Sequence, residues 1–264
     1  MKEDHGKLML QWLLPFAVAV IVVLIMFFNF SIKIKREAVV AVEDNIEKVA
    51  EKYALKVNGD LQSICAVGAT SAQVIAQQSS SDRKVLEQLL TSIVNNTEVT
   101  QAIYCDGNGN NIDHQGNEVD FGKNNYIEKL EKDPDINYIF EKEDFVTGGA
   151  SIIIRVPVEE TKGSILLFYP MKRLLTITEM SDEFNDSAFI SIVNANGDIF
   201  QSEDRESNFL KGNNIWANVD KEYQNDTSKA RVRMQNNKTG SFITMAGGEE
   251  RTLVYTPIGV EDWV

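Results

Sequence analysis

A long uncharged segment near the N-terminus limits what this chain can be. From Leu8 to Phe30 the sequence LMLQWLLPFAVAVIVVLIMFFNF contains no charged residue. A helix rises about 1.5 Å per residue, so about 20 apolar residues cross a hydrocarbon core about 30 Å thick. A cleaved signal peptide has an apolar region of only about 7 to 15 residues, followed by a small-residue cleavage site. Because SIKIKRE comes directly after the segment, we predict an uncleaved transmembrane helix at residues 8–30.

The distribution of charge bears on orientation and on partners. Residues 1–7 are net neutral, with two lysines and two acidic residues, whereas Lys33, Lys35 and Arg36 come after the span. These positive flanks mildly favour a cytoplasmic location for the region after the span, but a region as long as 31–264 is translocated largely regardless of its charge. We therefore predict a cytoplasmic N-terminus at 1–7 and an extracytoplasmic region at 31–264. The net charge of −13 repels phosphate backbones, so nucleic acid is not expected as a partner.

After the span, the apolar spacing predicts a long stalk helix. Apolar residues recur every three or four positions from Val39 to Val67, which places them on one stripe of a helix. This stripe packs on the core of its own domain, or forms the seam of a parallel homodimer, or does both. SSSD at Ser79 to Asp82 then offers an N-cap for a second helix through RKVLEQLLTSIV. Both helices fall within residues 31–98.

Two segments after residue 100 predict β-hairpins. IYCDGNGNNID and SIVNANGDIFQ each place an apolar strand before a five-residue turn, DGNGN in one and NANGD in the other. Asn-Gly supplies the positive φ angles that a tight hairpin needs. A calcium loop of the helix-loop-helix type needs Gly and Glu at its sixth and twelfth positions, where this chain has Asn111 and Asn117. We therefore expect hairpins and no metal here.

A second pair of segments indicates an internal repeat. GGASIIIRVPVEETKGSILLFYP and GGEERTLVYTPIGVEDWV each contain a glycine pair, an apolar strand, a proline and a new apolar strand. Six residues after Pro157 stands Gly163, and six residues after Pro257 stands Trp263. The hairpins and these segments occur in the same order twice, which predicts two modules, at 99–178 and 179–264. By this alignment the second module is truncated before its last strand.

The ordered set of motifs resembles the double-Cache family of bacterial extracytoplasmic sensors. The similarity is carried by YCDGNGNNID, FGKNNYIEKL, SIIIRVPVEETKGSILLFYPMKRL, FISIVNANGDIFQSE and SFITMAGGEERTLVYTPIGVEDWV. It implies an α+β fold: a transmembrane helix, a long stalk helix, and two tandem PAS-like antiparallel-sheet modules. Residues 99–178 would be the membrane-distal module and 179–264 the membrane-proximal one. Such regions sense a small molecule for a chemoreceptor, histidine kinase or diguanylate cyclase.

Two other functions compete with the sensor. A membrane-anchored binding or scaffold protein without a small-molecule ligand would share the same helix and modules. A tethered hydrolase has less support, because the chain has only two histidines, His5 and His114, and shows no paired carboxylates. We expect no enzyme activity, cofactor or metal site in these residues. Cys65 and Cys105 lie in apolar settings, where cysteine often acts as a small hydrophobe, so we do not expect a disulfide.

The resemblance also implies a ligand site in the membrane-distal module. Many amino-acid-binding members carry Arg, any residue, Trp and Tyr in the segment that matches FGKNNYIEKL, and these residues clamp a carboxylate. The matching positions here are Lys123, Asn125 and Tyr126, so only the tyrosine is kept. A lysine lacks the planar fork of arginine. Those members also place an aspartate on the last strand, where this chain has Phe168 and Tyr169, which argues against an amino-acid ligand.

Two further residues complete the predicted site, Tyr138 from the following strand and Arg155 from IIIRVPV. A cation inside an apolar strand normally needs a partner when it is buried. Arg155 therefore pairs with an acid such as Asp113 or Glu143, or is exposed on the outer face, or binds ligand. In the last case Arg155 and Lys123 favour an anionic small molecule such as an organic acid.

Overall fold

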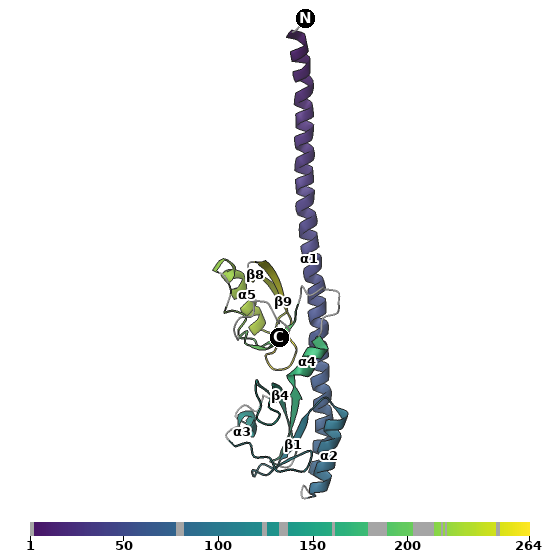
Figure 1. The fold of residues 1–264 in the computed structure, drawn as a ribbon, viewed down its shortest axis with the longest axis vertical. Coiled ribbons are helices and arrows are strands. Elements are labelled where there is room, and N and C mark those ends of the chain that lie inside the picture. Colours follow the sequence, from purple (N-terminus) through teal and green to yellow (C-terminus); the bar gives the residue numbers. More distant parts are fainter. Residues whose placement is uncertain are drawn as a thin grey trace. The chain divides into compact units, whose positions relative to one another are not determined.

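The computed structural model describes residues 3–77, 82–122, 126–131, 137–159, 162–178, 189–202, 214–217, 219, 221–246 and 249–264. Helix α1 (Glu3–Gln77) contains both the predicted membrane span and the predicted stalk helix without interruption (Figure 1). The chain divides into two compact units, residues 1–48 and residues 49–264.

The first unit is the N-terminal part of α1, and its apolar side chains from Phe16 to Val42 are exposed. Phe16 is 70% exposed and Phe27 is 71% exposed. In the described part of the chain, α1 is the one helix that is long and apolar enough to cross a membrane, judged by length and composition. Val39 and Val42 of the predicted stripe are also exposed. The homodimer seam stays a prediction.

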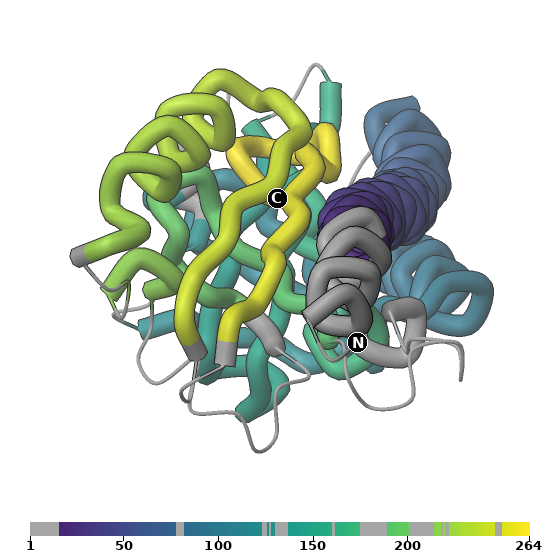
Figure 2. Tube along the Cα trace, turned by 90° about the horizontal axis from the view of Figure 1, so that it is seen from above, coloured from purple at the N-terminus to yellow at the C-terminus, as the bar shows by residue number. Residues whose placement is uncertain are grey.

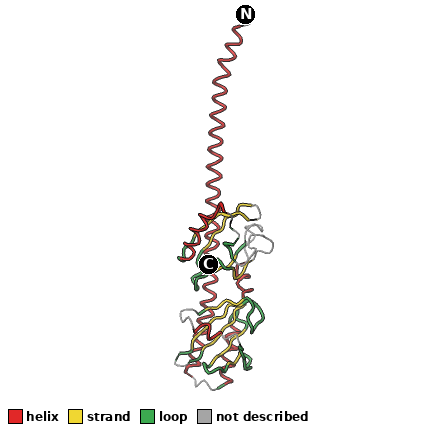
Figure 3. Tube along the Cα trace, turned by 90° about the vertical axis from the view of Figure 1, so that its left-hand side faces the viewer, coloured by secondary structure: helices red, strands yellow, loops and turns green. Residues whose placement is uncertain are grey.

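A five-stranded antiparallel sheet forms the centre of the second unit. Its strands are β1 (Gln101–Cys105), β2 (Asn111–Asp113), β3 (Tyr138–Glu141), β4 (Ser151–Pro157) and β5 (Ser164–Pro170), in the order β2-β1-β5-β4-β3. Figure 3 shows these strands side by side in its lower half. The runs SIIIRVP and SILLFYP are almost continuously apolar because both faces of the central strands are covered.

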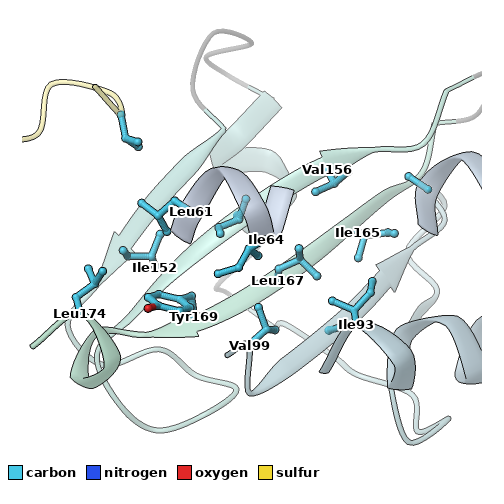
Figure 4. Close-up of a cluster of buried hydrophobic side chains, with 14 of the residues drawn as sticks. Leu61, Ile64, Ile93, Val99, Ile152, Val156, Ile165, Leu167, Tyr169 and Leu174 are labelled. Atoms are coloured by element: carbon cyan, nitrogen blue, oxygen red, sulfur yellow. The ribbon is translucent and has the colours of Figure 1, made fainter. Parts of the chain in front are cut away.

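One face of the sheet packs against α1 and α2 (Arg83–Asn96). Leu61 and Ile64 of α1 and Ile93 of α2 lie over Ile152, Ile165, Leu167 and Tyr169 of the sheet (Figure 4). The stripe on α1 thus packs on its own domain from Val57 onward. Helix α2 begins where predicted, since the side chain of Asp82 accepts a hydrogen bond of 3.1 Å from the Lys84 amide.

A second group of elements follows α4 (Met171–Thr178). It contains β6 (Ser191–Val193), β7 (Ile199–Ser202), the 3₁₀ turn η3 (Lys221–Tyr223), α5 (Gln224–Gln235), β8 (Gly240–Ala246) and β9 (Glu249–Tyr255). Among the described residues, β6 pairs with β7 and β8 pairs with β9 in two separate antiparallel sheets. Helix α5 lies beside the β8–β9 pair (Figure 2). Their shared apolar cluster includes Ala230, Met234, Phe242 and Tyr255.

Both predicted hairpins are confirmed, and their turns have the same hydrogen bonds. In the first, the side chain of Asp106 accepts hydrogen bonds from the amides of Asn108 at 2.7 Å and Asn110 at 3.1 Å. In the second, Asn194 accepts from the amides of Asn196 at 3.0 Å and Asp198 at 2.9 Å. An Asp or Asn at the first position therefore closes each turn by bonding its own backbone.

The strand register of the two copies agrees with the predicted repeat. Cys105 of β1 lies opposite Ser164 of β5. At the matching positions, Val193 and Val264 exchange both backbone hydrogen bonds, at 3.0 and 2.8 Å. When Pro257 is aligned with Pro157, β9 (Glu249–Tyr255) corresponds to residues 149–155, which overlap β4.

Candidate functional site

The face of the five-stranded sheet opposite α1 is the candidate site. We call it the α3 face, because α3 (Tyr126–Glu131) contributes Tyr126 to it. Its buried residues are Ile103, Cys105, Phe121, Tyr126, Ile153, Leu166 and Phe168. Three partly buried residues, Val119, Ile139 and Val146, pack against them. The face is therefore mostly apolar and is covered by segments that come after β2 and β3.

Tyr126, one of the predicted site residues, is buried in the α3 face. Only 1% of the residue is exposed. Its ring meets Phe121 edge to face at 5.5 Å between centroids and Phe168 at 5.8 Å. Burial raises the pKa of the Tyr126 hydroxyl, so the group stays protonated at neutral pH. The hydroxyl accepts a hydrogen bond of 3.0 Å from the amide of Phe145.

A buried aspartate holds the loop that supplies this amide. Asp144 is 1% exposed, and its carboxylate accepts hydrogen bonds from the amides of Val146 at 2.9 Å and Thr147 at 2.7 Å. The hydroxyl of Thr147 also donates to it. Sequence reasoning missed Asp144, although an aspartate shortly before a turn that ends in Gly148 and Gly149 is a signal for such a loop. Asp144 thus positions Tyr126 through Phe145.

Arg155 lies on the same side of the sheet, two residues along β4 from Ile153. Its side chain is half-buried, and Nε donates a hydrogen bond of 3.1 Å to the hydroxyl of Ser164 on β5. The acids named as partners are used elsewhere or exposed, since Asp113 binds its own turn and Glu143 is exposed. No acidic residue in the described part of the chain forms an ion pair with Arg155. Of the three alternatives for Arg155, pairing with Asp113 or Glu143 is therefore wrong.

Tyr138 is on the opposite face, and this corrects the predicted site. Its hydroxyl lies 3.2 Å from the sulfur of Cys65 on α1, and its ring lies 6.2 Å from that of Trp263. Successive strand residues point to opposite faces, so the neighbour Ile139 faces Tyr126 and Tyr138 cannot. Ile139, one residue after the predicted Tyr138, is the residue of β3 that lines the α3 face.

Two predicted residues, Lys123 and Asn125, lie outside the described residues. The nearest described cation of the covering helix is Lys129, which the sequence did not single out. Its Nζ lies 5.5 Å from the centroid of the Tyr126 ring and pairs with Glu141 of β3. The covering helix is thus tied to the edge strand by an ion pair.

Edge strand β3 also contacts the C-terminal segment. The amide of Asn137, just before β3, donates a hydrogen bond of 3.1 Å to the carboxylate of Glu261. On the face away from Tyr126, the rings of Phe140 and Phe200 lie 4.6 Å apart, and Phe200 lies 5.4 Å from Trp263. One face of β3 thus adjoins the candidate site, and the other face adjoins the second group of elements.

Cys65 and Cys105 are free thiols. Cys105 lies on the α3 face and Cys65 on α1, which covers the other face. Burial raises the pKa of the Cys105 thiol to about 12, and the nearby Asp106 carboxylate acts in the same direction. Neither position is poised as a nucleophile.

The Cys105 thiol has a testable pH dependence. The folded protein keeps this proton to a higher pH than the unfolded chain, whose thiol has an ordinary pKa of 9.0. The resulting stabilisation is full below about pH 9 and is lost as the pH rises toward 12. In urea denaturation, we expect the wild-type protein to lose stability between about pH 9 and 11 faster than Cys105→Ala. Parallel pH profiles would contradict this expectation.

Comparison with known proteins gives matches only among solved structures. No model of a known protein family and no curated protein matches the chain. The extracellular domain of histidine kinase rpHK1S-Z16 aligns with a TM-score of 0.66 and 13% identity, over 86% of this chain and 93% of that one.

Chemoreceptor domains from Pseudomonas match over a similar length. The ligand-binding domain of PctB of Pseudomonas aeruginosa PAO1, solved with L-Arg, has a TM-score of 0.61 and 13% identity, over 84% of this chain and 92% of that one. The domain of CtaA of Pseudomonas fluorescens, solved with L-isoleucine, has a TM-score of 0.61 and 16% identity, over 87% and 92%. At such identities the likeness shows the fold, which is the Cache-type fold with PAS-like sheets that the sequence predicted.

Proposed function

We propose that this chain is the extracytoplasmic ligand-sensing region of a transmembrane receptor. The observation that carries the proposal is the likeness of almost the whole chain to sensory domains of histidine kinases and chemoreceptors. In this proposal residues 8–30 anchor the chain in a membrane, 99–178 are the membrane-distal module and 179–264 the membrane-proximal one. The similar structures are ligand-binding sensor domains rather than enzymes.

The α3 face is the proposed ligand site. Tyr126, Arg155 and, from outside the described residues, Lys123 and Asn125 are its proposed contacts. Phe168 packs on the Tyr126 ring at the strand position where amino-acid-binding members of the resembled family carry an aspartate. This face therefore has a cation in Arg155 and lacks that carboxylate, which supports an anionic ligand that needs no amino group, such as an organic acid.

Strand β3 offers a route for the signal. Ile139 packs with the residues of the α3 face, and its neighbour Phe140 packs with Phe200 on the other side. A ligand that moves the covering helix also moves Glu141, through its ion pair with Lys129. The Asn137 amide and the ring of Tyr138 then transmit the displacement to residues 261–263.

A thermal-shift screen tests the site. The full chain in detergent micelles is screened against organic acids, amino acids, amines and purines, and we expect hits among the organic acids. A hydrogen bond between charged groups contributes about 1.5–3 kcal/mol, so Arg155→Gln should weaken the binding of a hit about 10- to 100-fold. The matched control is Arg173→Gln, which removes an arginine whose partner Glu98 is exposed.

Two results would count against this assignment. Hits confined to amines would contradict the anionic ligand. A hit whose affinity Arg155→Gln and Lys123→Ala both leave unchanged would remove these residues from the site.

The close packing of the α3 face supports a second candidate. The rings of Phe121, Tyr126 and Phe168 already contact one another. A membrane-anchored scaffold without a ligand would have such a filled face. It predicts no hit in the screen and no change in stability with any compound class.

A further inference from the structure

The chain contains three Asn-Gly pairs, at residues 58–59, 108–109 and 196–197. In such a pair the backbone nitrogen of the glycine can attack the side-chain amide carbon of the asparagine, which converts the asparagine to an acid. Glycine hinders this attack least, because it has no Cβ beside the attacking nitrogen. All three pairs have the same sequence, so any difference in their reactivity comes from the structure around them.

The pair at 108–109 lies in an open turn between β1 and β2. Asn108 and Gly109 are both exposed. A Cβ at Gly109 would have no atom within 4 Å. In the part of the chain that the structure describes, the amide of Gly109 has no hydrogen-bond partner. The attacking nitrogen is therefore free and in contact with solvent.

The side chain of Asn108 is held without being blocked. Within the described residues, its hydrogen-bond partner is the carboxylate of Asp106. A carboxylate only accepts hydrogen bonds, so this bond is made by the side-chain nitrogen of Asn108, which is the atom that leaves in the reaction. The same carboxylate accepts from the backbone amides of Asn108 and Asn110 and so closes the turn. The amide carbon of Asn108 stays available to the glycine nitrogen.

The matching pair at 196–197 is protected, although its turn is closed in the same way. Gly197 is buried, and its amide donates a hydrogen bond of 2.8 Å to the carbonyl of Asn194. A Cβ at Gly197 would overlap Nε1 of Trp216. The side chain of Asn214 also donates a hydrogen bond of 3.1 Å to the carbonyl of Asn196. Residues 214–216 therefore cover this turn, and the attacking nitrogen is already bonded.

The third pair, at 58–59, lies inside helix α1. In a helix each backbone amide donates to the carbonyl four residues earlier. The Gly59 nitrogen can attack only after this hydrogen bond breaks and the helix unwinds locally. Val57 and Leu61 on either side are buried in the core, so this unwinding would also expose apolar side chains.

We propose that Asn108 is a site of spontaneous deamidation, and that the fold protects Asn58 and Asn196 from the same reaction. The nitrogen of Gly109 loses its proton and forms a bond to Cγ of Asn108. The bond between Cγ and the side-chain nitrogen breaks, and ammonia leaves with that proton. Water then opens the cyclic imide at either of its C–N bonds, which yields aspartate or isoaspartate. One water replaces one ammonia, and nothing is oxidised or reduced.

Either product changes the turn between β1 and β2. Both products add a negative charge beside Asp106, and isoaspartate also lengthens the backbone by one carbon. The longer backbone displaces the amide of Asn110 from the Asp106 carboxylate, to which it now bonds at 3.1 Å. The reaction depends only on this hairpin. The inference therefore goes beyond the proposed function and holds whether or not the chain binds a ligand.

The test incubates the full chain in detergent micelles, in mildly alkaline buffer made with water enriched in heavy oxygen. Peptide mapping by mass spectrometry then measures the fraction of each asparagine that has become an acid carrying the heavy oxygen. We expect Asn108 to convert about 3- to 10-fold faster than Asn196, because opening one hydrogen bond corresponds to this factor. Asn58 should be the slowest of the three.

The matched control is the same chain unfolded in urea, where the three pairs should convert at similar rates. In the folded chain, Asn108→Gln should abolish conversion at this position, since the longer side chain forms the ring less readily, and should leave Asn196 unchanged. Conversion of Asn58 or Asn196 as fast as that of Asn108 in the folded chain would overturn the proposal. An intact Asn108 in the folded chain, at a time when the unfolded control has converted, would overturn it as well.

Discussion

Replacing Leu61 by alanine is expected to lower the free energy of unfolding by about 2–5 kcal/mol, the range for deleting a buried leucine side chain. Leu61 is 0% exposed and packs between α1 and the sheet (Figure 4). The neighbouring side chains belong to the long helix α1 and to hydrogen-bonded strands. They therefore cannot close fully around the cavity that the shorter alanine side chain leaves. Urea denaturation in detergent micelles, followed by tryptophan fluorescence, measures the loss.

Leu55 provides the matched control on the same helix. It is 72% exposed, so Leu55→Ala should change the free energy of unfolding by no more than about 0.5 kcal/mol. Equal effects of the two substitutions would show that α1 does not pack on the sheet through the stripe that contains Leu61.

Gly68→Leu is expected to destabilise the protein by about 3 kcal/mol, at the upper end of the usual cost of overpacking a core. A Cβ at Gly68 would lie 2.9 Å from Cγ2 of Val156 and 3.0 Å from Cδ1 of Leu167. Both contacts are shorter than normal carbon separations, and a leucine adds three more carbons beyond the Cβ. Helix α1 and the sheet must move apart to accept it. The same urea experiment measures this loss.

Gly59→Ala is the control for Gly68→Leu. Gly59 lies on the same helix, and a Cβ there would have no atom within 4 Å. Alanine is a better helix former than glycine by about 1 kcal/mol, so this variant should be more stable than wild type. A stable Gly68→Leu protein would mean that the helix does not approach the strands closely.

The candidate site was only partly predictable. Tyr126 was predicted because its position matches a motif of a known family, and it is buried in the α3 face, although its role in binding stays a prediction. Tyr138 was misplaced because alternation along a strand shows that neighbours face opposite ways, but not which of them faces a given layer. Asp144 was missed because its role depends on the folded loop that gives its carboxylate three donors.

Local patterns in the sequence by themselves determined several elements of this protein, but not α4 or α5. These patterns are the uncharged run from Leu8, the apolar stripe from Val39 to Val67, the two Asn-Gly turns, and the repeated order of strand, proline and strand. Each depends on interactions between residues that are close in the sequence. Only the tertiary structure decided which residues meet across distance. Arg155 bonds Ser164 because β4 and β5 pair in one register, and the ring of Trp216 lies against that of Phe242 because two segments far apart in the sequence pack together. Such contacts depend on strand pairing and packing between distant parts of the chain, and no local pattern specifies them.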